Sequence, residues 1–137
     1  MLRVRCMNER MIPDGLDYIL VVEDDRDLRE LLCEALRFEG YNVVCVEHGE
    51  AALRHLQGGA RPCMILLDLM MPVMDGWTFR REMLKDETLA DIPVVVMTAA
   101  GQMRAHTVVA NAVLHKPLEM NAIVELVQAH CPGGASS

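Results

Sequence analysis

Acids, a hydroxyl and a lysine stand where four apolar runs of this chain end. Glu23, Asp24 and Asp25 follow residues 18–22, Asp68 follows 63–67, Thr98 follows 92–97 and Lys116 follows 112–115. A carboxylate can attack phosphorus and form an aspartyl phosphate, and a nearby cation then stabilises the charge on the transferred group. If the four runs are strands of one sheet, these groups together would suit phosphoryl transfer.

Carboxylates that lie close together need a counter-charge, because like charges repel and resist ionisation. Mg²⁺ prefers oxygen ligands and commonly takes one or two carboxylates together with phosphate oxygens. A divalent cation with Lys116 would balance the three carboxylates of Glu23, Asp24 and Asp68. Taken singly, each residue has an ordinary structural explanation, since acids favour the first turns of helices. Their shared position at the strand ends is what indicates a site.

The apolar runs, with a further one at residues 41–46, are typical of strands buried on both faces, because they are short and rich in β-branched residues. Segments with helical character alternate with them, at residues 25–38, 50–56, 77–84 and 119–129, with a short helix expected within 103–110. This alternation predicts an α/β fold with a parallel sheet covered on both faces. Ligands of such sheets bind at the carboxyl ends of the strands, where the acids and Lys116 stand.

The segment 25–38 has the clearest helical face. Its apolar residues recur at intervals of three and four: Leu28, Leu31, Leu32, Ala35 and Leu36. Gly40 stands where a glycine commonly ends a helix. Beyond the repeating pattern, we expect a flexible lead-in at residues 1–16 and a disordered tail at 131–137, which leaves 17–130 as one domain.

The composition argues against several functional classes. The formal net charge is −7 and no run of Lys and Arg forms a basic stripe, so direct nucleic-acid binding is not expected. No apolar run approaches the roughly 20 residues of a membrane span, and the N-terminal arginines precede no signal-peptide core. The five cysteines are scattered without a C-x-x-C pair, so we expect free buried thiols in a reducing cytoplasm: Cys6, Cys33, Cys45, Cys63 and Cys131.

Four blocks in order make the chain resemble the receiver domain of two-component response regulators, in the chemotaxis-Y-like superfamily. They are ILVVEDD at 19–25, LLDLMMPVMDG at 66–76, PVVVMTA at 93–99, and Lys116-Pro117. The resemblance runs from about residue 17 to 129. It implies a flavodoxin-like (βα)5 fold, a doubly wound five-stranded parallel sheet of strand order 2-1-3-4-5. The stretch between Thr98 and Lys116 is short for the family, so the fourth helix should be shortened.

The resemblance also implies a phosphoacceptor and a metal site. Asp68 matches the acceptor of a phosphoryl group from a phosphohistidine. Asp24, Asp68 and the backbone carbonyl of Met70 match the ligands of Mg²⁺, which Mn²⁺ can replace, and Glu23 matches an acid that acts through water. Such proteins signal by changing shape and are not true enzymes, although they catalyse their own phosphotransfer and dephosphorylation.

Three further roles carry over by position. Thr98 matches the switch hydroxyl that moves toward the phosphoryl group, and Ala99 matches the small residue that leaves room for that group. Lys116 matches the lysine that pairs with the phosphoryl oxygens, and its bond to Pro117 is typically cis in the family. The implied partners are a sensor histidine kinase or histidine phosphotransfer protein and an unnamed downstream protein. The implied oligomeric state is a monomer or a phosphorylation-dependent dimer, in the cytoplasm and away from membrane and nucleic acid.

Two departures and three alternatives accompany this interpretation. Val113 replaces the aromatic residue that receivers usually carry three residues before the lysine, and the fourth helix is short, so the inward swing of an aromatic ring that usually accompanies output is not expected here. A phosphorylation-independent pseudo-receiver is the main alternative. A phosphatase on a related sheet would need a second acid two residues after the nucleophile, where Met70 stands. A flavodoxin would need a hydroxyl-rich phosphate loop where Glu23-Asp24-Asp25 stands.

Overall fold

The computed structural model describes residues 17–59, 61–99 and 108–131. Its five strands form one parallel sheet in the order β2-β1-β3-β4-β5. The strands are β1 (Ile19–Val22), β2 (Val43–Val46), β3 (Met64–Asp68), β4 (Val94–Thr98) and β5 (Ala112–His115). The helices are α1 (Arg26–Phe38), α2 (Gly49–Gln57), α3 (Gly76–Leu84), α4 (Glu87–Ala90) and α5 (Met120–His130). The predicted doubly wound fold and its strand order are confirmed.

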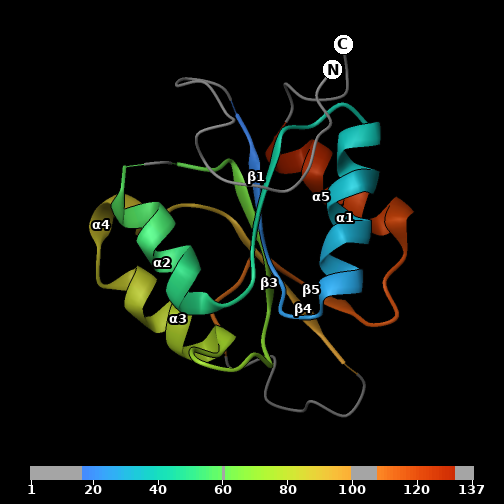
Figure 1. The fold of residues 1–137 in the computed structure, drawn as a ribbon. Helices are drawn as coiled ribbons and strands as arrows, with labels where there is room; N and C mark the ends of the chain where they lie inside the picture. The colour runs from blue at the N-terminus through green and yellow to red at the C-terminus, as the bar shows by residue number, and fades with distance from the viewer. Residues whose placement is uncertain (1–16, 60, 100–107, 132–137) are drawn as a thin grey trace.

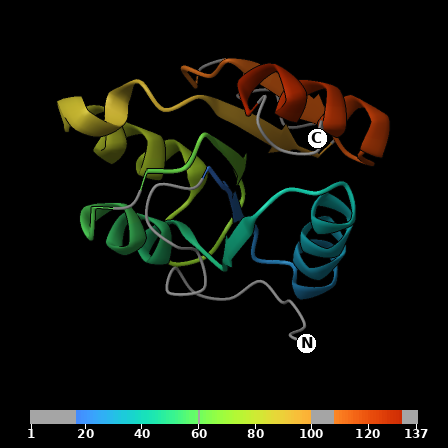
Figure 2. The ribbon, with the colours of Figure 1, turned by 90° about the horizontal axis from the view of Figure 1, so that it is seen from above.

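The sheet lies between two layers of helices, with α1 and α5 on one face and α2, α3 and α4 on the other (Figures 1 and 2). Successive residues of a strand point to opposite faces, so each strand contributes to both cores. Leu20, Ile65 and Val94 join the core beneath α2 and α3. Ile19, Leu66 and Val95 join the core beneath α1 and α5. Burial on both faces explains why the strands are continuous apolar runs.

The ends of α1 follow from local sequence. The Asp25 carboxylate caps the helix, because its Oδ1 accepts from the backbone N–H groups of Asp27 at 3.0 Å and Leu28 at 3.2 Å. Gly40 follows the helix with a φ of 99°, which glycine adopts at little cost. The expected inward face needs one correction. Leu31 is 59 % exposed, because the buried side of the helix is centred on Leu32, Cys33 and Leu36 and Leu31 lies to one side of it.

Two parts of the chain between α3 and β5 differ from the prediction. The short helix α4 was not expected, since four residues are too few to show a helical period. Of the helix expected within 103–110, residues 103–107 lie outside the described part of the chain and 108–110 are not helical. The segment that leads into β5 is held by Arg80, whose Nε donates to the carbonyl oxygen of Val109 at 2.7 Å. Burial lowers the pKa of this guanidinium.

The prediction of free thiols is wrong for the described cysteines. Cys63 and Cys131 form a disulfide that joins the start of β3 to the end of α5, with their Cα atoms 5.6 Å apart. Cys33 and Cys45 are also disulfide-bonded. Cys6 lies outside the described residues. The Cys63–Cys131 pair is 68 residues apart in sequence, and the spacing of cysteines along a chain does not reveal such pairs.

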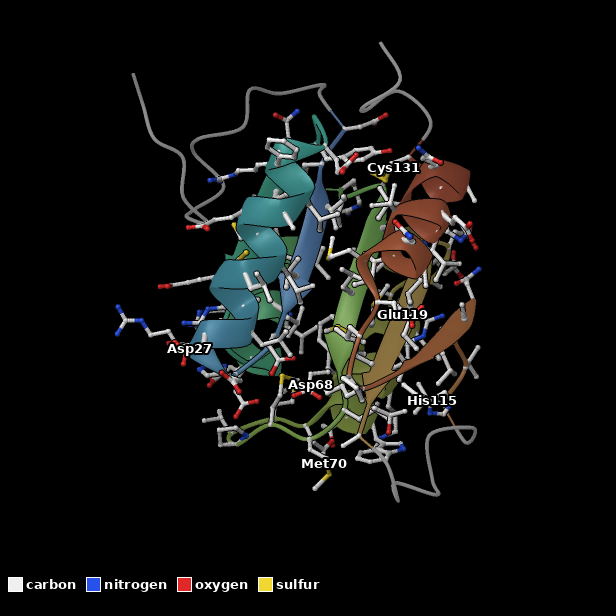
Figure 3. The ribbon with its side chains drawn as sticks, turned by 90° about the vertical axis from the view of Figure 1, so that its right-hand side faces the viewer. Asp27, Asp68, Met70, His115, Glu119 and Cys131 are labelled. Atoms are coloured by element: carbon white, nitrogen blue, oxygen red, sulfur yellow. A yellow bond between two sulfur atoms is a disulfide. The ribbon has the colours of Figure 1, made fainter. Side chains whose placement is uncertain are left out.

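The expected flexible lead-in, residues 1–16, and most of the expected tail lie outside the described residues. Cys131, which we assigned to the start of that tail, is only 1 % exposed, so the ordered chain extends through it. Cys131 and Asp68 lie toward opposite ends of the molecule (Figure 3). Across the stretches that the structure describes, none of the helices has the length and apolar character needed to cross a bilayer.

Candidate phosphoacceptor and metal site

Three carboxylates meet where β1 and β3 end. These strands are neighbours in register, with Val22 opposite Leu67, so the residues that follow them are also side by side. Carboxylate oxygens of Glu23, Asp24 and Asp68 all lie within 4.8 Å of one another. Glu23 and Asp68 are buried, whereas Asp24 is exposed. The predicted convergence of acids at this edge is therefore present.

Lys116 reaches into the acidic cluster from the end of β5. Its Nζ lies 3.2 Å from Oε1 of Glu23 and 3.4 Å from Oδ1 of Asp68. Its backbone N–H donates to the carbonyl oxygen of Thr98 at 2.8 Å, which ties the lysine to the end of β4. The bond between Lys116 and Pro117 is cis, as the family resemblance implied.

The cluster shifts the pKa values of Asp68 and Lys116. Burial raises the pKa of Asp68 to about 7, and the negative charge of Glu23 adds to the rise while Lys116 opposes it. A hydrogen bond with Asp24 and the charge of Asp24 raise it further. Burial would lower the pKa of Lys116, but the charges of Glu23 and Asp68 raise it overall. Without a further cation, the site holds more negative charge than one lysine balances, and this excess favours protonation of Asp68.

The loop after β1 is held by hydrogen bonds at each residue. Oε2 of Glu23 accepts from the backbone N–H of Asp25 at 3.1 Å, while Oε1 contacts Lys116. From the second turn of α1, Nη1 of Arg29 donates to the carbonyl oxygens of Glu23 at 2.9 Å and Asp24 at 3.3 Å. Sequence reasoning missed Arg29. Its signal would have been a basic residue one helical turn beyond an acidic loop.

The loop after β3 turns sharply and packs against α3. The backbone N–H of Met74 donates to the carbonyl of Pro72 at 2.7 Å, and Val73 between them has a φ of 68°. Gly76 lies against the backbone of the acceptor. A Cβ there would come within 2.7 Å of the Asp68 carbonyl oxygen, and the Gly76 N–H donates to Leu69 at 2.9 Å. Glycine is thus required for α3 to begin this close to the acceptor strand.

The donor set suits a hard divalent cation. Carboxylate oxygens select Mg²⁺, Ca²⁺ or Mn²⁺ over metals that favour sulfur or imidazole. Mg²⁺ needs few protein carboxylates because it keeps several waters, and the exposed face of Asp24 leaves room for them. The residues present therefore fit a magnesium site.

A protein-family model described as the response regulator receiver domain matches residues 19–128. The chain belongs to this family. Receiver domains are typically signalling phosphoacceptors rather than true enzymes, and they interact with histidine kinases. The acidic cluster of Glu23, Asp24 and Asp68 is consistent with the Mg²⁺ site typical of receivers.

Curated relatives and solved structures agree with this assignment. The chain is 39 % identical over 93 residues to the transcriptional regulatory protein BaeR of Escherichia coli, covering 68 % of this chain and 37 % of BaeR. It is 39 % identical over 89 residues to the regulator RpaA of Synechocystis, covering 63 % of this chain and 35 % of RpaA. The receiver thus spans little more than a third of the length of these relatives.

Among solved structures, the receiver domain of the sensor histidine kinase PA1611 from Pseudomonas aeruginosa matches with a TM-score of 0.77 and 29 % identity. The match covers 85 % of this chain and 98 % of that one, and that structure has a magnesium ion in its active-site cleft. A response regulator from Chloroflexus aurantiacus matches with a TM-score of 0.77 and 28 % identity, over 84 % of this chain and 97 % of that one.

The remaining predicted residues of the receiver stand at the end of β4, in the loop after β3 and on β5. Thr98 is buried and follows Met97, the register partner of Asp68, and its hydroxyl lies 3.4 Å from the Ala99 carbonyl oxygen. Ala99 is exposed at the end of β4. Met70 is 56 % exposed and its side chain points away from the body of the domain (Figure 3). Val113, on β5, is 36 % exposed.

Proposed function

We propose that this receiver accepts a phosphoryl group on Asp68 from a phosphohistidine, in a Mg²⁺-dependent reaction, and signals by the resulting change of conformation. The observation that carries the proposal is the convergence of Lys116 with the buried carboxylates of Glu23 and Asp68 at one edge of the sheet. A buried cluster of this kind costs stability, since charges are expensive to desolvate. Its retention is explained by chemistry at Asp68.

In the proposed reaction, a carboxylate oxygen of Asp68 attacks phosphorus. An oxygen–phosphorus bond forms, the phosphorus–nitrogen bond of the donor breaks, and the histidine ring leaves with the electron pair. Asp68 must be ionised to attack, and because its pKa is raised, a bound cation would increase the fraction that is ionised near neutral pH. When bound by Asp24, Asp68 and the Met70 carbonyl, with Glu23 acting through water, Mg²⁺ would supply charge that stabilises the phosphoryl oxygens.

Three residues of the chain would then act on the phosphoryl group. Lys116, already oriented by Glu23, would pair with one of its oxygens. Thr98 would donate its hydroxyl, a short movement for a residue that neighbours the register partner of Asp68. Ala99 would leave the space that the group occupies.

The partners follow from the same chemistry. The donor is a sensor histidine kinase or a histidine phosphotransfer protein, and we infer that the target is a protein. Val113 has no ring to move inward and is stiff at its first torsion, so the output would come from the segment after Ala99. The domain would act as a monomer or as a phosphorylation-dependent dimer.

Intact-mass measurement after incubation with acetyl phosphate and Mg²⁺ tests the proposal. Wild type is expected to gain one phosphoryl mass, and Asp68→Asn is expected to gain none. Thr78→Ala, a change in the first turns of α3, is the control and should behave as wild type. Equal labelling of Asp68→Asn would show that another residue is the acceptor.

A pseudo-receiver that signals without phosphate is the competing function. It predicts that neither acetyl phosphate nor beryllofluoride, a phosphoryl mimic, affects wild type in the presence of Mg²⁺. The intact set of Asp24, Asp68 and Lys116 favours the phosphoacceptor, because a module that only docks partners has no use for a buried, partly uncompensated acidic cluster.

A further inference from the structure

We propose that Arg29 is a positioning residue for the metal site, because its guanidinium holds the backbone that presents Glu23 and Asp24. The inference rests on the proposed Mg²⁺-dependent function. Arg29 lies in the second turn of α1 and is half-buried. Its Nη1 donates to two consecutive carbonyl oxygens, those of Glu23 and Asp24, at 2.9 and 3.3 Å.

These two carbonyls lie between the regular hydrogen bonding of β1 and that of α1. The backbone N–H of Glu23 still continues the pairing with β2, through the carbonyl of Val46 at 3.2 Å. The first carbonyl to accept inside the helix is that of Asp25, which bonds the Arg29 N–H at 2.9 Å. The Glu23 and Asp24 carbonyls fall in the gap, and the same arginine that closes the first helical bond reaches back to both of them.

The side chains of the loop depend on this backbone. Glu23 divides its two carboxylate oxygens between the Asp25 N–H and Lys116, so its orientation requires the loop in this conformation. Asp24 is exposed, and its carboxylate reaches Asp68 from a position that the loop backbone sets. Groups that orient metal ligands without touching the metal commonly contribute tenfold or more to affinity.

The charge of Arg29 acts in the opposite direction to its hydrogen bonds. A guanidinium near a cation site repels the cation, so if charge were its main effect, removing it would tighten metal binding. If holding the loop is its main effect, removing it weakens metal binding. The two roles therefore predict changes of opposite sign, and one substitution separates them.

The experiment compares Arg29→Gln and Arg29→Lys with wild type by ¹⁵N–¹H NMR titration with MgCl₂ at constant ionic strength. The spectra also confirm that each variant is folded. We expect Arg29→Gln to bind Mg²⁺ roughly tenfold more weakly and Arg29→Lys to recover part of the loss. Arg26→Gln is the matched control. Arg26 carries the same charge on the same helix but is 78 % exposed and pairs with Glu30, so its removal should not weaken binding.

A metal-free measurement accompanies the titration. In EDTA, the Asp25 amide should exchange its hydrogen several-fold faster in Arg29→Gln than in Arg26→Gln, because a loosened loop breaks the bond to Glu23. Tighter or unchanged Mg²⁺ binding in Arg29→Gln overturns the inference, as does an Asp25 amide with unchanged exchange. Failure of wild type to bind Mg²⁺ overturns the proposed function itself, and the amide exchange then still decides whether Arg29 holds the loop.

Discussion

The two ends of the sheet are built in opposite ways. At the carboxyl end, Glu23, Asp68 and Lys116 meet with charges that do not cancel, and burial raises the pKa of Asp68 to about 7. At the amino end, the disulfide from Cys63 to Cys131 joins the chain without any charged group. One end carries electrostatic cost and the other is cross-linked. We infer that the stability added by the cross-link at one end offsets the electrostatic cost of the charged cluster at the other.

A second contact at the amino end shows how complete this contrast is. The Tyr18 hydroxyl lies 2.6 Å from Nε2 of His55, and the two rings meet edge to face. Both residues are buried, and they lie where β1 begins and where α2 ends. We therefore expect changes at the amino end to lower stability and leave the chemistry intact, and changes to the charged cluster at the carboxyl end to impair the chemistry without lowering stability.

Lys116→Ala should have the largest effect and should fall on chemistry. We expect phosphorylation by acetyl phosphate to slow by roughly 10²–10³-fold, because the charge aimed at the phosphoryl oxygens is lost. Intact mass measured over time gives the rate. Lys85→Ala is the control, since Lys85 pairs with Glu82 on the surface. Unchanged kinetics in Lys116→Ala would remove the lysine from the reaction.

Removal of the disulfide should have the next largest effect and should fall on stability. Cys63→Ser should lower the free energy of unfolding by about 2–4 kcal/mol under oxidising conditions, because the link closes a long loop in the unfolded chain. Urea denaturation gives the value. Cys131→Ser should match it, and the double variant should be no less stable than either single one. A phosphorylation rate that falls with stability would break the proposed separation of the two ends.

The pH dependence of stability should show the free-energy cost of ionising the buried Asp68. A carboxyl whose pKa is raised on folding binds its proton more tightly in the folded state, so stability falls as pH rises from about 4 to about 7. Lys116, with a raised pKa, stays charged throughout this range. In EDTA, Asp68→Asn should therefore become more stable than wild type over that interval, by about 1–3 kcal/mol at its end. If the difference in unfolding free energy between wild type and Asp68→Asn did not change with pH, the burial of a charged Asp68 would be contradicted.

Tyr18→Phe should have a smaller effect. It removes a buried hydroxyl from the contact with His55 and should cost about 1 kcal/mol of unfolding free energy, measured by urea denaturation. Mg²⁺ affinity should stay as in wild type. Tyr41→Phe is the comparison variant for Tyr18→Phe, because Tyr41 is as buried as Tyr18 but packs in the core on the other face of the sheet. A change in Mg²⁺ affinity on losing the Tyr18 hydroxyl would show that the two ends are coupled.

Val73→Gly should have the smallest effect. A β-branched residue with a φ of 68° is strained, and glycine relieves this at an entropic cost that offsets much of the gain. We expect a net stabilisation of about 0.5 kcal/mol in thermal unfolding. Val46→Gly, which introduces glycine in a strand, should destabilise. A loss of stability in Val73→Gly would mean that the side chain packs better than its 72 % exposure suggests.

The sequence alone predicted the parallel sheet, the edge that carries the site and the residues Glu23, Asp24, Asp68 and Lys116. It did so because hydrophobic periodicity and strand ends are local properties, and parallel connectivity brings the carboxyl ends of strands together. Only the tertiary structure decided the pairing of Cys63 with Cys131, the reach of Arg29 to the carbonyls of the acidic loop, and the raised pKa of Asp68. Each of these depends on distances between groups and on burial, which packing determines and residue order does not encode locally.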